Sequence, residues 1–447
     1  MKPESGESAI GNRESKRRVF LRGLLVACLS FPCAAFGAGA TAQDAAAPAS
    51  TDSPFPAPDS RPVVSLLTIG PGEIFFERFG HNALVVRDEA SGEAVAYNYG
   101  IFDFAQEDFL LNFARGRMRY RIAADALEDD LAMYRAEGRS IVEQRLDLEP
   151  GQALALARFL AWNARPENAQ YRYDYFEANC STRVRDALDR ALGGALRAQS
   201  EGRSRGYTYR LDALRLMAPE PALALLIDLG LGPYADQRID FWQESFVPET
   251  LRGVVAQARL DKPDGRSVPL AAATATLAEG RVEEPPALPP DLRLPFLLAG
   301  LGIGALLFWL GRARRTAARA PLAAFAMLFE LLCGLGGLAL AFLWFGTEHR
   351  AAWRNENLLL LNPLCLWLAA SWAGALAGRT PGRASRAVAW LVVLCAAFAL
   401  FSKILPWFVQ SNLQWIVLLA PIHLALALSL APAPRRAAAA AAQVPAR

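Results

Sequence analysis

The sequence predicts an α+β domain outside the membrane, followed by an all-α transmembrane bundle of five helices. Three observations predict this organisation. Five long apolar runs are gathered after residue 290, residues 61–260 mix strand-like and helix-like periodicity, and a basic start followed by an apolar stretch opens the chain. The net charge is only +3 over 447 residues. This balance excludes a strongly basic nucleic-acid-binding protein and an acidic solvating chain.

The N-terminal region is typical of an exported protein. Residues 1–42 predict a signal peptide or an N-terminal anchor, because basic residues at 16–18 precede an apolar stretch that ends in small residues. Residues 43–60 are rich in Ala, Pro, Ser and Asp, which predicts a flexible linker.

Residues 61–260 predict a mixed domain, taken here in chain order. Strands are expected at Val63–Ile69, Ala83–Arg87, Ala94–Tyr99 and Ile141–Leu148, and helices at Asp103–Phe113, Leu127–Glu137, 150–163 and Ser181–Leu192. The second and third strands form a predicted hairpin around Ser91-Gly92. Residues 261–290 hold six Pro and show little periodicity, so they predict a second, Pro-rich linker.

Residues 291–431 predict five transmembrane helices, each close to the ~20 residues that a bilayer requires. The apolar runs are Leu294–Gly311, Ala320–Gly346, Leu358–Gly378, Ala387–Val409 and Leu413–Ala431. Arginines gather in the loops 312–319 and 379–386 and in the tail 432–447. The positive-inside rule therefore predicts a cytoplasmic tail and a periplasmic 61–260 domain on a bacterial inner membrane.

The 61–260 domain contains a single cysteine, Cys180, and a single histidine, His81. This scarcity argues against a Cys/His zinc site and a disulfide framework in the domain. No phosphate-binding loop or dinucleotide fingerprint occurs there either. We therefore expect no metal and no cofactor.

Cys180 is the candidate nucleophile because it lies at the predicted start of a helix. The polar residues that follow suit a helix N-terminus, and the helix dipole together with Arg183 and Arg185 is expected to lower the thiol pKa. The alternative is a buried structural cysteine, which is a common location for a free thiol.

His81 is the candidate general base, and it needs a third group to orient its ring. If the hairpin turns at Ser91-Gly92, even-numbered residues of its second strand share a face with odd-numbered residues of the first. His81 then shares a face with Asn98. We take Asn98 as the orienting residue and Asp103 as the alternative.

These residues carry a resemblance to a known family. A histidine followed by a cysteine at the head of a helix resembles the circularly permuted papain-like fold of NlpC-type and lecithin-retinol-acyltransferase-type enzymes. The segments 79–84, 97–104 and 179–186 (FGHNAL, YNYGIFDF and NCSTRVRD) resemble more narrowly the Lnb N-terminal periplasmic domain family. That family is named for a bacterial lipoprotein N-acyltransferase in which a periplasmic papain-like domain is fused to membrane helices.

The resemblance implies acyl transfer through a thioester on Cys180, with His81 as the base. The acyl donor would be a phospholipid, and the acceptor would be an amine such as the α-amine of a lipoprotein N-terminal cysteine. Asn179 or a backbone N–H at the helix start would hold the oxyanion.

Polar residues near the outer ends of the second and third spans suggest a substrate-binding region on the same side as the soluble domain. His349, Asn355 and Asn357 are the candidates for a lipid headgroup or acceptor pocket, and interfacial flanks are the alternative interpretation. Glu330 lies deep in the second span and needs a partner, whereas His423 is interpreted as a packed helix-interface residue.

Two other functions stay open at this stage. The same Cys180 and His81 would serve an NlpC-like cysteine peptidase or amidase that acts on cell-wall peptides, although that activity gives no reason for five spans. A non-catalytic lipid-binding or envelope-assembly module is the third possibility.

Overall fold

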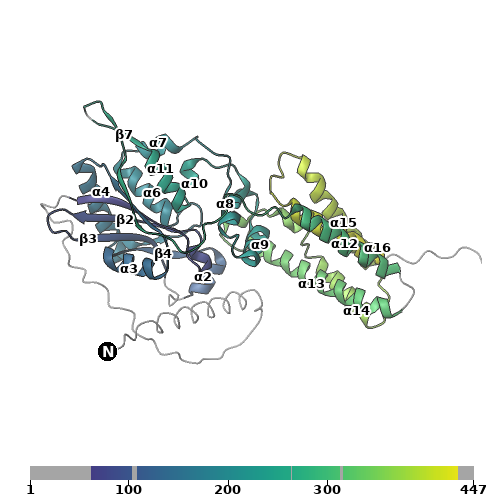
Figure 1. The fold of residues 1–447 in the computed structure, drawn as a ribbon. Coiled ribbons are helices and arrows are strands. Elements are labelled where there is room, and N and C mark those ends of the chain that lie inside the picture. The colour runs from purple at the N-terminus through teal and green to yellow at the C-terminus, as the bar shows by residue number, and fades with distance from the viewer. Residues whose placement is uncertain (1–61, 103–107, 263, 313–315, 431–447) are drawn as a thin grey trace, which may run out of the picture.

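The computed structural model describes residues 62–102, 108–262, 264–312 and 316–430, which form an α+β domain and a helical bundle (Figure 1). Several sequence-based predictions lie outside the described residues: the signal segment 1–42, the linker 43–60, the alternative orienting residue Asp103 and the tail 432–447.

A seven-stranded antiparallel sheet forms the frame of the α+β domain, with strand order β6-β4-β3-β2-β1-β5-β9. The strands are β1 (Pro62–Ile69), β2 (His81–Asp88), β3 (Ala94–Ile101), β4 (Arg119–Ala126), β5 (Ile141–Leu146), β6 (Gln170–Arg172) and β9 (Ala271–Ala278). The predicted hairpin is present as β2–β3, and Ala83 pairs with Asn98. The face shared by His81 and Asn98 therefore follows from the register, as predicted.

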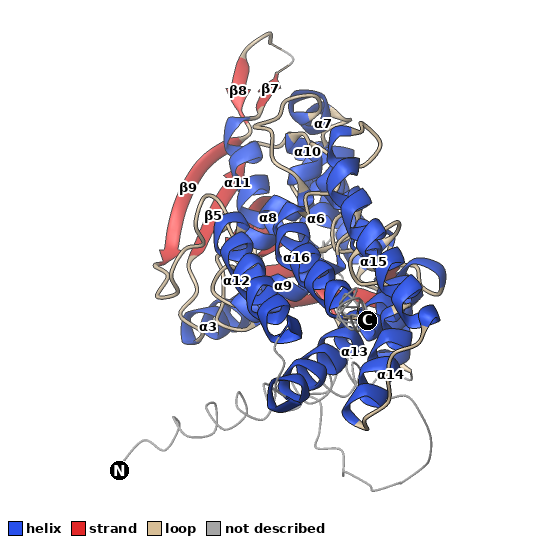
Figure 2. Cartoon of the chain, turned by 90° about the vertical axis from the view of Figure 1, so that its right-hand side faces the viewer, coloured by secondary structure: helices blue, strands red, loops and turns tan. Residues whose placement is uncertain are grey.

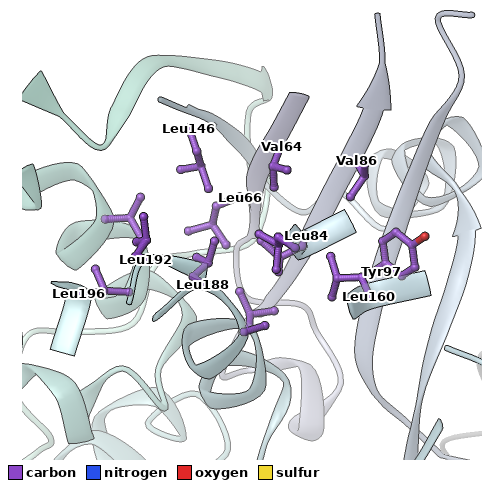
Figure 3. Packing of buried hydrophobic residues seen from close by; sticks show 14 of the residues in the cluster. Val64, Leu66, Leu84, Val86, Tyr97, Leu146, Leu160, Leu188, Leu192 and Leu196 are labelled. Atoms are coloured by element: carbon purple, nitrogen blue, oxygen red, sulfur yellow. The ribbon is translucent and has the colours of Figure 1, made fainter. Parts of the chain in front are cut away.

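Both faces of the sheet are buried. On one face, α4 (Pro150–Asn163), α6 (Cys180–Ala191), α7 (Ala195–Ser200) and α11 (Pro248–Gln257) cover the main core. Figure 3 shows strand residues Leu66 and Leu84 close to Leu188 of α6 in this core. On the other face, α3 (Leu127–Ala136) packs Leu131 and Tyr134 against the strands.

Shorter elements fill the remaining connections. They are η1 (Phe75–Glu77), α2 (Phe109–Arg115), α5 (Pro166–Ala169), α8 (Tyr209–Leu216), α9 (Pro221–Gly230), η2 (Pro233–Asp236) and α10 (Phe241–Glu244). Strands β7 (Arg259–Asp261) and β8 (Ser267–Pro269) form a hairpin that projects from the domain (Figure 2).

The linker predicted at 261–290 is wrong over much of its length. Strand β9 pairs with β5 along its length and completes the sheet, and Figure 2 shows the two strands side by side. Most side chains of the AAATATLA sequence of β9 are exposed, so this edge strand has no apolar alternation to reveal it. The pairing depends on backbone hydrogen bonds that β5 leaves available.

The helical bundle contains five apolar helices of ten residues or more in its described part. They are α12 (Arg293–Arg312), α13 (Thr316–Phe345), α14 (Cys365–Leu376), α15 (Arg383–Phe401) and α16 (Leu413–Ser429). Three of them are long and apolar enough to cross a membrane on their own, whereas α14 and α16 are shorter. The third predicted span, Leu358–Gly378, begins at the end of η4 (Glu356–Leu359) and in irregular backbone before α14. The short helix η3 (Arg350–Ala352) precedes it, and η5 (Ser402–Ile404) follows α15.

Several contacts join the two domains, and two groups of them mark where the domains meet. At the first, the amide of Glu348 donates to the carbonyl of Arg115 at the end of α2 (2.8 Å), and its carboxylate pairs with Arg117 at 2.7 Å. At the second, Asp228 of α9 accepts hydrogen bonds from Gln414 (2.7 Å) and Trp415 (2.8 Å) of α16. These contacts attach the α+β domain to the end of the bundle where α13 ends and α16 begins (Figure 1).

Candidate functional site

Cys180 is the first residue of α6, as the sequence predicts. Asn179 precedes it in extended conformation, and its side chain accepts hydrogen bonds from the amides of Ser181 (3.0 Å) and Thr182 (2.9 Å). Thr182 completes a capping box by accepting from the amide of Asn179 at 2.8 Å. The local sequence thus fixes where the helix begins and holds Cys180 in its first turn.

The side chain of Asn179 is fully used by these structural contacts. Its Nδ2 donates to the carbonyls of Tyr175 (3.1 Å) and Phe246 (2.9 Å), while its Oδ1 caps the helix. The expected oxyanion role of the Asn179 side chain therefore has no free donor to support it. Backbone amides of Asn82, Cys180 and Ser181 lie beside the thiol instead, and that of Ser181 is already bonded to Asn179.

His81 lies at the start of β2 and is hydrogen-bonded to Asn98 of β3. The His81 Nε2 and the Asn98 Oδ1 are 3.0 Å apart. The Nδ2 of Asn98 in turn donates to Asp130 of α3 at 2.7 Å, with Asp125 of β4 further away at 3.4 Å. The sequence-based pairing of His81 with Asn98 is thus present as a direct contact.

Asp130 determines which way this chain of hydrogen bonds runs. A carboxylate accepts hydrogen bonds, so it fixes the Nδ2 of Asn98 toward itself and leaves Oδ1 toward His81. The Nε2 of His81 must then carry the proton, and Nδ1 keeps its lone pair. The arrangement prepares His81 as a neutral base whose free nitrogen is Nδ1.

Cys180 and His81 share the same surroundings. The amide of Asn82, the residue after His81, lies beside the Cys180 thiol, and Arg139 acts electrostatically on both residues. Gly100 of β3 has φ +93° and packs directly against Cys180. A Cβ atom added at residue 100 would lie 3.3 Å from the Cβ of Cys180. Among the described residues, no hydrogen bond joins the thiol directly to the imidazole.

Burial sets the protonation of both groups. It lowers the pKa of His81 from 6.5 to about 4, although the hydrogen bond that His81 donates to Asn98 opposes this shift. Burial also raises the pKa of the Cys180 thiol, while the nearby amides and Arg139 act in the opposite direction. The pair therefore rests as a neutral thiol beside a neutral imidazole.

The expected lowering of the thiol pKa by Arg183 and Arg185 does not occur. Arg183 stacks over Tyr171, 4.4 Å from the ring centre, and Arg185 stacks over Trp242 at 3.9 Å. Both guanidinium groups are engaged with aromatic rings, and the main influences on the thiol pKa are burial, nearby backbone amides and Arg139. Desolvation by burial outweighs the nearby backbone amides and Arg139, so the pKa of the thiol is raised.

A row of aromatic rings connects this region with the helical bundle. Tyr173 and Tyr175 follow β6, and Tyr173 stacks on Tyr120 with ring centres 4.1 Å apart. Tyr175 stacks on His349 at 6.0 Å, and the ring of His349 also bonds the carbonyl of Phe113 at 2.9 Å. His349, expected at a substrate-binding region, is thus packed between the α+β domain and the bundle.

Asn355 and Asn357 do not form an open pocket. Both are buried, and the Nδ2 of Asn355 donates to the carbonyls of Leu229 (2.9 Å) and Gly230 (3.0 Å) at the end of α9. Asn357 donates to Leu229 at 3.0 Å and accepts from Asn412 at 2.8 Å. Their polar atoms bind the two domains together, and the substrate-binding role of these residues stays a prediction.

Fold and contacts together define a class: a membrane protein whose extramembrane α+β domain holds a cysteine, a histidine and an asparagine at one end of its sheet. The chain belongs to the Lnb family. The family model described as the Lnb N-terminal periplasmic domain matches residues 57–219, and the one described as the Lnb transmembrane domain matches residues 294–436. A periplasmic domain joined to a transmembrane domain indicates an inner-membrane protein. No curated protein and no solved structure matches the chain.

Sequence reasoning missed Asp130 and Arg139. Asp130 is one of three acidic residues in the first turn of α3, and nothing in the sequence singles it out as the buried one. Arg139 is almost fully buried, donates from Nε to the carbonyl of Gly70 (2.9 Å) and lies over the ring of Tyr134. A buried arginine in an Arg-rich chain leaves no distinguishing pattern.

Proposed function

We propose that the protein is a cysteine-dependent acyltransferase of the inner membrane. In this proposal it moves an acyl chain from a phospholipid through a Cys180 thioester to an acceptor amine, such as the N-terminus of a lipoprotein. The observation that carries the proposal is the contact series Asp130–Asn98–His81, which leaves the free nitrogen of an oriented imidazole in the neighbourhood of Cys180.

The proposed reaction has two balanced steps. In the first, His81 takes the thiol proton as the sulfur attacks the ester carbonyl; the ester C–O bond breaks, and the leaving lysophospholipid oxygen takes up that proton. In the second, the acceptor amine attacks the thioester, the C–S bond breaks, and the amine proton returns to the thiol through His81. A neutral imidazole suits the first step, because only the unprotonated ring accepts a proton.

Exposed apolar residues near the bundle support a lipid substrate. Leu110 and Leu111 of α2 are 63% and 43% exposed, and α2 ends where its last residue contacts Glu348 of the bundle. Phe76 of η1 is also exposed, and its ring meets that of Phe102, which stacks on Phe109 of α2. Apolar side chains gathered on one exposed surface are a feature of membrane and ligand contact sites.

The test is mass spectrometry of a lipoprotein N-terminal peptide from cells that lack their own N-acylation activity and express this protein. Cys180→Ser is the inactive variant, and Cys395→Ser, which removes a free thiol of α15, is the matched control. We expect an added N-acyl chain with the wild type and with Cys395→Ser, and none with Cys180→Ser.

Other outcomes would redirect the assignment. Acylation that survives Cys180→Ser would show that Cys180 is not the nucleophile. Absence of acylation, with the protein present in the membrane and cell-wall peptides released instead, would favour the peptidase function. If neither acylated lipoprotein nor released cell-wall peptide is detected, the result would favour a non-catalytic lipid-binding or assembly module.

A further inference from the structure

Three metal-ligating side chains meet inside the helical bundle, away from Cys180. Glu330 lies midway along α13, Cys365 begins α14, and His423 lies within α16. One ligand atom from each residue lies within 4.8 Å of the other two, and all three residues are almost completely buried. We propose that Glu330, Cys365 and His423 form a binding site for a divalent metal ion, and that the ion is Zn²⁺.

The tautomer of His423 supports this proposal. The Nε2 of His423 is 3.0 Å from the carbonyl of Leu360, and a carbonyl can only accept a hydrogen bond. Nε2 therefore carries the proton, and Nδ1 presents a lone pair. A ring that donates one N–H to a backbone carbonyl while the other nitrogen faces outward is the usual arrangement of a metal-binding histidine.

Two of the acceptor atoms that face one another in this cluster have no hydrogen-bond donor in the described structure. The Nδ1 of His423 lies 4.0 Å from the Oε1 of Glu330, too far for a hydrogen bond, and it has no partner in the described structure. The Oε2 of Glu330 also lacks a partner there. An imidazole lone pair and a carboxylate facing each other in an apolar interior are unfavourable unless a cation or a proton lies between them.

The ligand chemistry selects the ion. Imidazole, thiolate and carboxylate together are the donor types that Zn²⁺ binds, whereas Ca²⁺ and Mg²⁺ prefer oxygen donors alone. Cys365 already contacts Glu330 through a hydrogen bond, so its sulfur points into the cluster. The sequence-based expectation of no metal considered only the soluble domain.

The location explains what such an ion would do for the fold. The third span starts as irregular backbone, which includes Leu360, and Cys365 is the first residue of α14 after it. An ion at this position would join α13, α14 and α16 at the point where α14 lacks a preceding helical turn. At membrane depth, the N–H and C=O groups of irregular backbone need hydrogen-bond partners from the surrounding protein.

The experiment is metal analysis of the full chain, purified in detergent without chelators. We expect about one zinc per chain by elemental mass spectrometry, as in a structural site, and the same content in Cys395→Ser, whose thiol lies outside the cluster. Cys365→Ser and His423→Gln should lose most of the zinc. The Gln variant keeps a donor for the Leu360 carbonyl, which limits damage to the fold.

A spectroscopic readout separates a built site from surface-bound metal. After exchange with Co²⁺, the wild type should show visible bands of tetrahedral cobalt and a thiolate-to-cobalt charge-transfer band. Cys365→Ser should lose the charge-transfer band while remaining monodisperse on gel filtration. A folded wild type that holds no zinc and gives no cobalt bands would overturn the proposal and assign the gap to a shared proton. Zinc content unchanged in both variants would overturn it equally.

Discussion

The side chain of Asn98 donates to the carboxylate of Asp130 at 2.7 Å, and this contact decides the tautomer of His81. Asp130 comes from α3, which follows β4 in the chain, whereas His81 is the first residue of β2. A residue remote from the Cys180 helix thereby controls which nitrogen of the imidazole is free.

Replacement of Asn98 should slow thioester formation without unfolding the protein. Asn98→Ala removes the acceptor of the His81 Nε2 proton, so the ring can rotate and change tautomer. We expect acyl-thioester formation on Cys180 from a phospholipid to slow on the order of 100-fold, measured by single-turnover mass spectrometry of the Cys180 peptide. An unchanged rate would exclude Asn98 as the positioning residue.

His81 and Asp130 should give opposite dependences of stability on pH. Burial lowers the His81 pKa to about 4, so its contribution is present above 6.5 and is lost as pH falls through 4. Burial raises the Asp130 pKa from 3.8 to about 6, so its contribution is present below 3.8 and is lost as pH rises through 6. In the wild type the contributions of His81 and Asp130 therefore oppose each other between about pH 4 and pH 6.

Single variants should separate the contribution of His81 to the pH dependence of stability from that of Asp130, in thermal melts of the full chain. Relative to the wild type, His81→Gln should lose stability as pH rises from 4 to 6, because Asp130 then acts alone. Asp130→Asn should lose stability as pH falls from 6.5 to 4. Curves that run parallel to the wild type would contradict the assigned burial of these groups.

Asn179→Ala should destabilise the protein more than an ordinary helix cap. The variant removes the cap of α6 and leaves the carbonyls of Tyr175 and Phe246 without a donor. We expect a loss of about 2–3 kcal/mol in the free energy of unfolding. Thr208→Ala, which removes the cap of α8, is the control and should cost about 1 kcal/mol. Equal losses in the two variants would contradict the bridging role of Asn179.

Gly116→Ala should loosen the contact between the two domains. Gly116 has φ +72°, and an added Cβ would lie 2.8 Å from the amide nitrogen of His349. Gly202→Ala is the matched control, because φ is +74° there and no atom lies within 4 Å of the added Cβ. Hydrogen–deuterium exchange at 346–350 should rise in the first variant only. Equal exchange would show that the added Cβ does not disturb the interface.

Patterns with a physical period were predictable from the sequence. The alternation of Ala83–Arg87 and Ala94–Tyr99 gave the hairpin and the face shared by His81 and Asn98. The helical repeat after Asn179 placed Cys180 in a first turn. Periodicity carries this information because it reports which side of an element is buried.

Properties that depend on tertiary environment were not predictable. The thiol pKa depends on how deeply α6 packs against the sheet, and no local charge count reports that depth. Asn355 and Asn357 look like any interfacial polar residues until α9 is placed against them. Strand β9 is recognisable only once β5 offers an open edge.

The position of β9 gives the chain a definite order of assembly. Its residues 271–278 are the last of the sheet, and α12 begins at Arg293, so only a short segment separates the final strand from the first span of the bundle. At most ~3.5 Å per residue is available to an extended chain, which holds the completed sheet within about 50 Å of the bilayer. During synthesis the domain therefore cannot close before the first bundle helix is about to emerge. Secretion of the soluble half and insertion of the membrane half become consecutive stages of one event.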